Sequence, residues 1–274
     1  MNTQKISVII CSIEAGKFAR ISESYKHLLA GHPLEIIGIH DAKSLAEGYN
    51  RGIQQSSGDI LIFSHDDILI IDPDFHEKIV SRLATYDVLG FVGTSRLITG
   101  TWFGAGQPYL HGVISHARPK EAKLTIDIFG VADWPIISDI KAVDGLCMIT
   151  KREVAVDIGF DATTFDGFHL YDLDFSFSAY RAGYKLAVCC DIPIIHESTG
   201  QFDSKHQEFA NRFISKHGDF LDAGTPADNR RGQQKTPAGR GALLPDYHAL
   251  LRTWQPEVLK RTTAAIHREA LTAR

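Results

Sequence analysis

Two adjacent carboxylates interrupt an apolar run, "ILIFSHDDILI", at Asp66 and Asp67. An ionised carboxylate is costly to remove from water unless it is paired or binds a metal. The surrounding run predicts a buried strand, so two acidic side chains at its end need a physical reason. A divalent ion supplies one, because Mg²⁺ and Mn²⁺ prefer oxygen ligands. The alternative is that both aspartates cap the following turn through local hydrogen bonds.

A second acidic pair, Asp172 and Asp174, stands in "YDLDFSFSAYRAG". The pattern predicts a helix that begins near Asp172 and ends at Gly183. A carboxylate at this place can accept a proton from an attacking hydroxyl group. Because the helix dipole favours the ionised form, we expect Asp172 to be deprotonated at neutral pH and a weak base. The alternative role is a helix N-cap, for which Asp is a preferred residue.

Histidines supply a third kind of candidate. His196 ends the apolar run in "IPIIHESTG", and neutral imidazole is a suitable ligand for Mn²⁺. A lone histidine after a strand is equally compatible with a structural role. His65, His111 and His116 show no ligand spacing, and we interpret them as solvated or hydrogen-bonded loop histidines rather than as a metal cluster of their own.

The composition is that of an ordinary globular protein. The 274 residues are 44% hydrophobic and 23% charged, enough for one large α/β domain or two small ones. The formal net charge of -4 gives no indication of nucleic-acid binding.

The compartment is predicted from cysteines and apolar runs. Cys11, Cys147, Cys189 and Cys190 form no spaced CxxC pair, which argues against a zinc cage and fits a reducing, cytoplasmic location. The N-terminal run "KISVIIC" is too short for a signal peptide or a membrane span.

The positions of these candidates follow from the expected elements. Three apolar, β-branched runs, "KISVIICS", "LEIIGIH" and "GDILIFS", alternate with helical patterns at Phe18–Ala30 and Leu45–Gln55. This rhythm predicts a parallel sheet covered on both faces. Ligands of such sheets bind outside the carboxyl ends of the strands, where Asp41 and the pair Asp66–Asp67 stand.

The later segments are less regular. Helices are expected at 74–84, 151–157 and 204–217, and strands at 88–92, 141–150 and 184–190. The segment 93–119, rich in glycine and aromatic residues, is interpreted as loops and short strands that line a pocket. Polar residues with repeated Gly and Pro over 221–244 predict a linker, and 245–274 has a helical pattern.

Four motifs together resemble a known family: "GDILIFSHDD", "KAVDGLCMITKREVAVDIGFD", "LYDLDFSFSAYRAGYKLAV" and "IPIIHESTG". In this order they are similar to the inverting glycosyltransferases of the GT-A fold, of the large family 2 type, over roughly residues 5 to 217. The resemblance implies an α/β fold with a mostly parallel, Rossmann-like sheet flanked by helices. The domain would span 1–220, followed by the linker 221–244 and a C-terminal helical extension, 245–274.

The resemblance also implies roles for the candidates. The D-x-D motif of the family corresponds to Ser64, His65 and Asp66, with Ser64 in place of the first Asp. Asp66 would then contact the metal, Mn²⁺ or Mg²⁺, and the donor diphosphate, and His196 would complete the metal site.

The catalytic base of the family corresponds to Asp172, and Tyr171 stands where the family usually has Glu. Asp41 would recognise the nucleobase, although it could instead form a turn. The usual nucleotide-binding turn is not kept after the first strand. The residues assigned to nucleotide and donor binding are Cys11, Ser12, Asp41, His65, Asp66, Asp144 and Gly145. The residues assigned to the acceptor are Asp174 and Trp102.

The expected function is metal-dependent, inverting transfer of a sugar in polysaccharide biosynthesis. The donor would be a nucleotide diphosphate sugar, with UDP-sugar favoured, and the acceptor a hydroxyl of a glycan or a lipid-linked molecule. We expect a cytoplasmic protein that does not bind nucleic acid. Contact with the inner face of the membrane, and a homo-oligomer formed through the C-terminal helices, are left open.

Three alternatives remain. A sugar nucleotidyltransferase has a similar sheet, but it would place a glycine-rich phosphate loop after the first strand, where "CSIEAGKF" has only Gly16. A catalytically degenerate binding module is favoured by Ser64 and Tyr171, and opposed by the retained Asp66, Asp172 and His196. A pure interaction protein would act through its tail helices.

Overall fold

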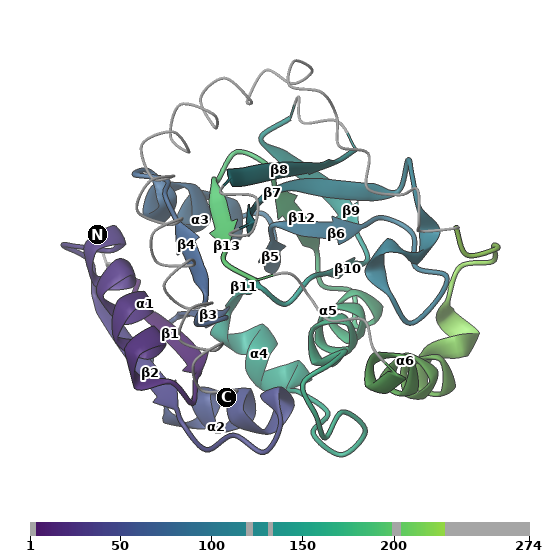
Figure 1. Cartoon of the computed structure of the whole chain (residues 1–274), viewed down its shortest axis with the longest axis horizontal. Helices are drawn as coiled ribbons and strands as arrows, with labels where there is room; N and C mark the ends of the chain where they lie inside the picture. Colours follow the sequence, from purple (N-terminus) through teal and green to yellow (C-terminus); the bar gives the residue numbers. More distant parts are fainter. Residues whose placement is uncertain (1–3, 119–122, 131–133, 199–203, 228–274) are drawn as a thin grey trace, which may run out of the picture.

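Seven strands form the central sheet of the computed structural model, which describes residues 4–118, 123–130, 134–198 and 204–227 (Figure 1). Their order across the sheet is β2 (Leu34–Ile39), β1 (Ile6–Cys11), β3 (Ile60–Ser64), β11 (Cys147–Lys151), β5 (Val88–Gly90), β12 (Leu186–Cys189) and β9 (Ile136–Ile140). The strands β2, β1 and β3 pair in parallel, β11 lies antiparallel to β3 and to β5, and β12 is parallel to β5. The predicted α/β class with a mostly parallel sheet is therefore confirmed.

The parallel register brings two strand ends to one edge. Ile10 of β1 pairs with Ser64 of β3, so the residues that follow each strand leave the sheet side by side. This is the edge at which the sequence places Ser12 and the pair Asp66–Asp67.

Within the described ranges, six α-helices surround the sheet: α1 (Ala15–Leu28), α2 (Leu45–Gln55), α3 (Phe75–Leu83), α4 (Arg152–Ile158), α5 (Tyr171–Arg181) and α6 (Ser204–His217). Successive side chains of a strand point to opposite faces, and β1 shows the consequence. Val8 and Ile10 pack into a core with α1 and α3, whereas Ile9 packs into a core with α2, α4 and α5. Both faces of the sheet are covered, as predicted.

A second sheet stands beside the first and was not predicted. Its strands, in spatial order, are β10 (Ala142–Val143), β6 (Val92–Thr94), β7 (Leu110–Arg118), β13 (Ile194–His196) and β4 (Ile68–Ile70), with β8 (Lys123–Phe129) paired to β7. In Figure 1 it lies above α4, α5 and α6. The nine-residue β7 falls in the segment interpreted as loops and short strands. Its sequence, "LHGVISHAR", contains Gly112 and two histidines, which interrupt the apolar pattern. The strand is ordered by its pairing with β6, β8 and β13.

The last described residues bind to the domain. Asp222 accepts hydrogen bonds from the backbone N–H of Leu97 at 2.8 Å and from Nζ of Lys141 at 2.6 Å. The N–H of Ala227 donates to the carbonyl of Gly104 at 2.9 Å. The beginning of the expected linker, 221–227, is therefore part of the folded unit. The rest of that linker and the helical extension 245–274 lie outside the described residues.

None of the helices in the described ranges is both long enough and apolar enough to cross a bilayer.

Candidate active site

Three side chains converge where β3 gives way to β4. His65 and Asp67 stand in the turn between these strands, and His196 ends β13. Antiparallel pairing of β13 with β4 places His196 opposite Ile68, the residue next to Asp67. Oδ1 of Asp67 lies 3.2 Å from Nε2 of His196 and 4.0 Å from Nδ1 of His65. One ligand atom from each of the three lies within 4.8 Å of the others.

The cluster is electrostatically coupled. Burial acts to raise the pKa of Asp67, but the hydrogen bond and charge of His196, and then the charge of His65, hold that pKa well below its ordinary value. Burial acts to lower the pKa of His196, yet Asp67 outweighs it and raises that pKa. Burial and the neighbouring His196 lower the pKa of His65. The result is an anionic carboxylate between two imidazoles, whose protons a metal ion can displace.

The donor chemistry of this cluster fits a transition metal ion. One carboxylate and two imidazoles suit Mn²⁺ and its heavier neighbours, whereas Mg²⁺ favours all-oxygen sites with several waters. Asp67, rather than the predicted Asp66, is the carboxylate of the cluster. In the turn between β3 and β4, Asp67 lies beside His65 and His196, whereas the carboxylate of Asp66 binds Ser12.

Asp66 instead links the residues that follow β3 to those that follow β1, where donor binding is predicted. Its Oδ2 accepts a hydrogen bond from Oγ of Ser12 at 2.6 Å, and the carbonyl of Ser12 lies 2.8 Å from Nδ1 of His40. Ser64, at the first position of the partial D-x-D motif, is fully buried and binds Tyr25 and the carbonyl of His65. Its replacement of Asp therefore removes no ligand from the cluster.

Cys11 and Asp41 are also predicted to bind the donor, and neither belongs to the His65–Asp67–His196 cluster. Cys11 is half-buried at the end of β1, and burial raises the pKa of its thiol to about 12, so it stays protonated. Asp41 is exposed and its carboxylate binds the guanidinium of Arg51 at 2.9 Å. The structure does not bring Asp41 to the His65–Asp67–His196 cluster.

Asp172 is held by the turn between β10 and β11. Its Oδ2 accepts a hydrogen bond from the N–H of Gly145 at 2.8 Å. A Cβ on Gly145 would lie 2.7 Å from Cβ of Asp172 and still closer to the hydroxyl of Tyr171, so only glycine permits this approach. The helix N-cap position is Leu170, with φ of 62°, and Asp172 lies inside the first turn. The N-cap alternative is therefore wrong.

Asp144 lies beside Asp172 in the same turn. Its Oδ1 accepts from the N–H of Leu146 and its Oδ2 from Nε1 of Trp102, each at 3.0 Å. Burial, and then the charge of Asp144, raise the pKa of Asp172 to about 7 despite hydrogen bonds from backbone amides. The expectation that the helix dipole keeps this pKa low is wrong, because desolvation outweighs the dipole. A base with a pKa near neutral pH is better matched to proton transfer.

Tyr171 connects the base to the cluster. Its hydroxyl lies 2.8 Å from Nε2 of His65 and donates to the carbonyl of Gly145 at 3.3 Å. Burial raises the pKa of Tyr171 well above its ordinary value, so the hydroxyl keeps its proton. With that proton directed to Gly145, Nε2–H of His65 donates to the tyrosine oxygen, and Nδ1 is left to face Asp67. Such an outer partner fixes the ring of a metal-binding histidine.

Asp174 has a different role from the predicted acceptor contact. It is buried, and its Oδ1 lies 2.7 Å from Nε2 of His217 and 2.8 Å from Nζ of Lys216. Residues two apart on a helix do not face each other, so Asp174 points away from Asp172. It anchors α6 and is not exposed to an acceptor.

The other two histidines belong to β7 rather than to loops. Nδ1 of His116 binds Oδ2 of Asp127 at 2.7 Å, and Nε2 of His111 binds Oγ of Ser95 at 3.0 Å. The interpretation of both as hydrogen-bonded is confirmed. His116 also pairs in register with His196, and their rings lie 5.7 Å apart.

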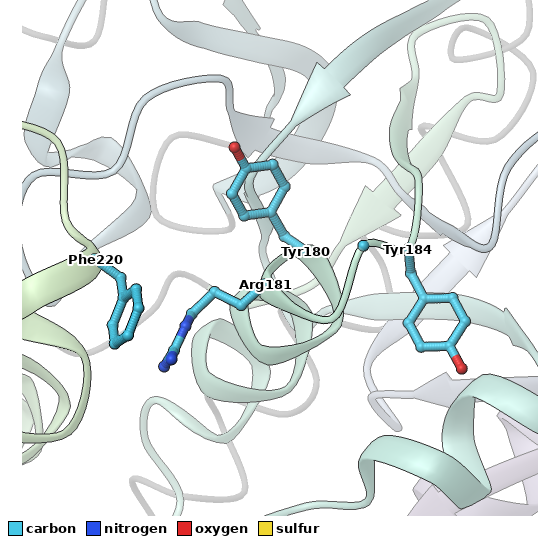
Figure 2. Close-up of a pocket in the computed structure, with 5 residues that line it drawn as sticks. Tyr180, Arg181, Tyr184 and Phe220 are labelled. Carbon is cyan, nitrogen blue, oxygen red and sulfur yellow. The ribbon is translucent and has the colours of Figure 1, made fainter.

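A shallow hollow of about 470 Å³ lies away from these residues, lined by Tyr180, Arg181, Gly183, Tyr184 and Phe220 (Figure 2). It lies at the last turn of α5, at the other end of this helix from the turn that contains Asp172. The guanidinium of Arg181 lies 3.3 Å from the ring centre of Phe220. The hollow contains none of the predicted site residues.

Known proteins resemble this chain at the level of the family. A family model described as glycosyltransferase like family matches residues 7–217. No curated protein matches the chain. The resemblance to glycosyltransferases is therefore confirmed at the level of the family.

Solved structures show weaker likenesses. Mannosyltransferase PcManGT from Pyrobaculum calidifontis, in complex with GDP-Man and Mn²⁺, is similar with a TM-score of 0.47 and 15% identity, over 100% of this chain and 77% of that one. GalNAc-T7 with UDP, GalNAc and Mn²⁺ has a TM-score of 0.48 and 12% identity, over 94% and 50%. A197 from STIV has a TM-score of 0.41 and 13% identity, over 71% and 86%. Such low values carry no property of these proteins over to this chain.

Proposed function

Because the chain belongs to the glycosyltransferase-like family, whose model matches residues 7–217, we propose that it is a metal-dependent, inverting glycosyltransferase. The donor is a nucleotide diphosphate sugar, with UDP-sugar favoured, and the acceptor is a hydroxyl of a glycan or a lipid-linked molecule in polysaccharide biosynthesis in the cytoplasm. One observation carries the proposal. A buried carboxylate with a pKa of about 7, Asp172, is joined through Tyr171 to the carboxylate–histidine cluster.

In the proposed reaction, Asp172 accepts the proton of the acceptor hydroxyl. The oxygen attacks the anomeric carbon, the new C–O bond forms, and the bond to the donor diphosphate breaks on the opposite side, which inverts the configuration. Gly145 holds Oδ2 of Asp172 by a hydrogen bond of 2.8 Å. Burial, and then the charge of Asp144, keep the pKa of Asp172 high, so the carboxylate is basic enough to take the proton.

His65, Asp67 and His196 are the residues that would hold the metal ion, and their two imidazoles favour Mn²⁺ over Mg²⁺. When bound, the ion would neutralise charge on the departing diphosphate. Ser12 and Asp66 stand beside the cluster, at the shared edge of β1 and β3, and would contact the donor. Trp102 binds Asp144 through its indole N–H and would present its ring on the acceptor side.

The catalytic unit of this proposal is the domain 1–220. Residues 221–227 bind to this domain. The segments 228–244 and 245–274 would serve as connection and helical extension, available for contact with a second copy or with the inner face of a membrane.

Calorimetric titration with UDP, with and without Mn²⁺, tests the proposal before any acceptor is known. UDP should bind only with Mn²⁺, and Asp67→Ala should remove that binding. Asp166→Ala is the matched control, because Asp166 is an exposed carboxylate whose Arg212 partner lies on α6. Preference for another nucleoside diphosphate would change the donor and keep the mechanism. If the folded protein binds none of them, the degenerate binding module replaces the proposed enzyme.

A further inference from the structure

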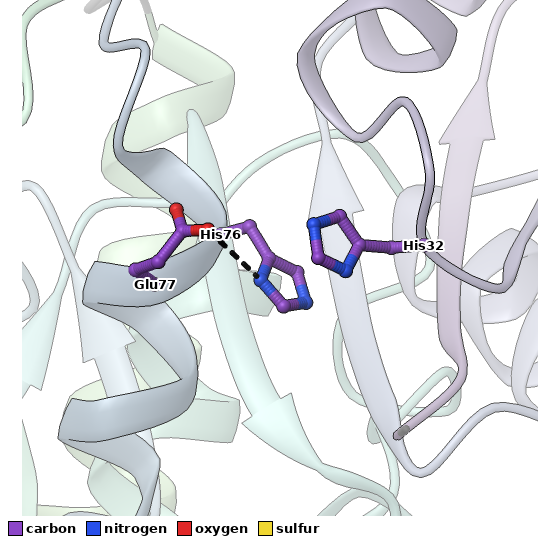
Figure 3. Close-up of side chains that lie close together, drawn as sticks. All are labelled: His32, His76 and Glu77. Atoms are coloured by element: carbon purple, nitrogen blue, oxygen red, sulfur yellow. Dashed lines mark ion pairs between the residues drawn. The ribbon is translucent and has the colours of Figure 1, made fainter.

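A second cluster, separate from the candidate active site, contains His32, His76 and Glu77 (Figure 3). His32 lies in the turn between α1 and β2, where its N–H donates to the carbonyl of Leu29 at 3.2 Å. His76 and Glu77 lie in the first turn of α3. The two imidazole rings face each other with centres 3.3 Å apart and planes 17° apart. No part of the proposed reaction uses these residues.

The imidazoles have unused nitrogen atoms. Nδ1 of His32 and Nδ1 of His76 are both buried, and neither has a hydrogen-bond partner within the described part of the chain. A buried polar atom without a partner is costly, and its presence in a native protein needs an explanation. Two such atoms in adjacent rings point to a partner that the described part of the chain does not supply.

Glu77 supplies a negative charge at a suitable distance. Its Oε1 lies 3.9 Å from Nδ1 of His76, which is too far for a hydrogen bond. A metal ion with bonds of about 2.1 Å to each atom can join atoms up to about 4.2 Å apart. One ligand atom from each of the three residues lies within 4.8 Å of the others. The carboxylate side chain is 68% exposed, so an ion and its waters can enter from solvent.

We propose that His32, His76 and Glu77 bind one late transition metal ion of the Zn²⁺, Co²⁺ or Ni²⁺ class, with water as the remaining ligand. Two imidazoles and one carboxylate suit these ions and not Mg²⁺ or Ca²⁺. Because nearly parallel rings do not direct their in-plane lone pairs to one point, binding requires the two rings to turn relative to each other. The ion ties the α1–β2 turn to α3. This site does not depend on the proposed transferase activity.

The experiment is a titration of the full chain with Zn²⁺ and with Co²⁺, followed by calorimetry and by the visible absorption of bound Co²⁺. The Asp67→Ala background removes the cluster at the candidate active site. In that background we expect one equivalent of Zn²⁺ to bind. Adding His76→Ala should weaken binding by roughly tenfold or more, since even outer partners of a metal site contribute that much. Adding His27→Ala, which removes an exposed histidine of α1, should change nothing.

Two results overturn the proposal: no Zn²⁺ bound by Asp67→Ala, or unchanged affinity after His76→Ala. If circular dichroism shows that His76→Ala does not fold, Glu77→Gln decides, because Glu77 is largely exposed and its change leaves the core intact. Weaker Zn²⁺ and Co²⁺ binding by Glu77→Gln supports the site, and unchanged binding refutes it.

Discussion

The hydroxyl of Tyr171 lies 2.8 Å from Nε2 of His65, and this contact joins the helix of the candidate base to the candidate metal cluster. Tyr171 precedes Asp172 directly in α5, so this contact connects His65 to the helical turn that holds the carboxylate. The tyrosine stands where the resemblance led us to expect Glu. It supplies a hydrogen-bond partner for an imidazole, and a third carboxylate next to Asp172 and Asp144 would add to their repulsion.

Tyr171→Phe should weaken Mn²⁺ binding while leaving the fold intact. The phenyl ring keeps its packing against Tyr49, whose ring centre is 5.6 Å away, but Nε2 of His65 loses its partner. We expect the affinity for Mn²⁺ to fall roughly tenfold to a hundredfold, the usual effect of removing an outer partner of a metal ligand. Calorimetric titration with Mn²⁺ measures it.

The matched control for that change is Tyr49→Phe. The hydroxyl of Tyr49 is also buried, but it donates to the carbonyl of Ser64 at 3.4 Å and does not touch His65. Equal Mn²⁺ affinities of the two variants would show that Tyr171 does not orient the cluster.

Turnover should depend on the ionisation of Asp172. The pKa of about 7 predicts that kcat/KM rises with pH and levels off above that value, because the base acts only when it is deprotonated. Asp172→Asn should abolish transfer and preserve the Mn²⁺-dependent binding of the nucleotide. The pH–rate profile of the wild type and the single-pH activity of the variant are the two measurements. A variant that turns over at the wild-type rate would remove Asp172 from the role of base.

The same carboxylate should make stability depend on pH. The pKa of Asp172 is raised from about 3.9 in the unfolded chain to about 7 in the folded protein, so the folded state binds the additional proton between these values. The free energy of unfolding should therefore fall as pH rises through this window. Asp172→Asn removes the ionisable group, and at pH 8 it should be more stable than the wild type, by roughly 1 to 4 kcal/mol.

Urea unfolding of the wild type and Asp172→Asn at pH 5 and pH 8 checks this sign. The advantage of the variant should be larger at the higher pH. An advantage that does not change with pH would indicate a packing effect of the amide and leave the raised pKa without support.

The fold could be predicted from the sequence where the signal is local. The runs of β1 and β3 are largely apolar and rich in β-branched residues, and they predict buried parallel strands. The expectation that β2 is buried is wrong, because it contains Glu35 and lies at the edge of the sheet, where it is mostly half-buried. The second sheet could not be predicted in this way. Its longest strand, β7, interrupts the apolar pattern with Gly112 and two histidines, and only pairing with three other strands orders it.

The sequence indicates where the candidate site lies, but not which side chains form the cluster. The strand-end rule places Asp66 and Asp67 where β3 ends, and His65 and His196 lie beside Asp67 there. The D-x-D resemblance drew the metal role to Asp66 instead. Tyr171 carried no signal except its departure from the family. The pKa of Asp172 depends on burial by residues far along the chain, which a local motif does not contain.

Asp174 provides a test of the anchor between α5 and α6. Its buried carboxylate binds both Lys216 and His217, whose side chains are 31% and 1% exposed. Asp174→Ala leaves these two groups without their buried partner, and breaking such a pair costs about 3 kcal/mol of unfolding free energy. Asp166→Ala breaks an exposed pair with Arg212 of α6, and it should cost much less, because solvent screens an exposed ion pair. Urea unfolding at pH 7 compares the two, and equal losses would mean that the Asp174 contacts contribute no more than a surface ion pair.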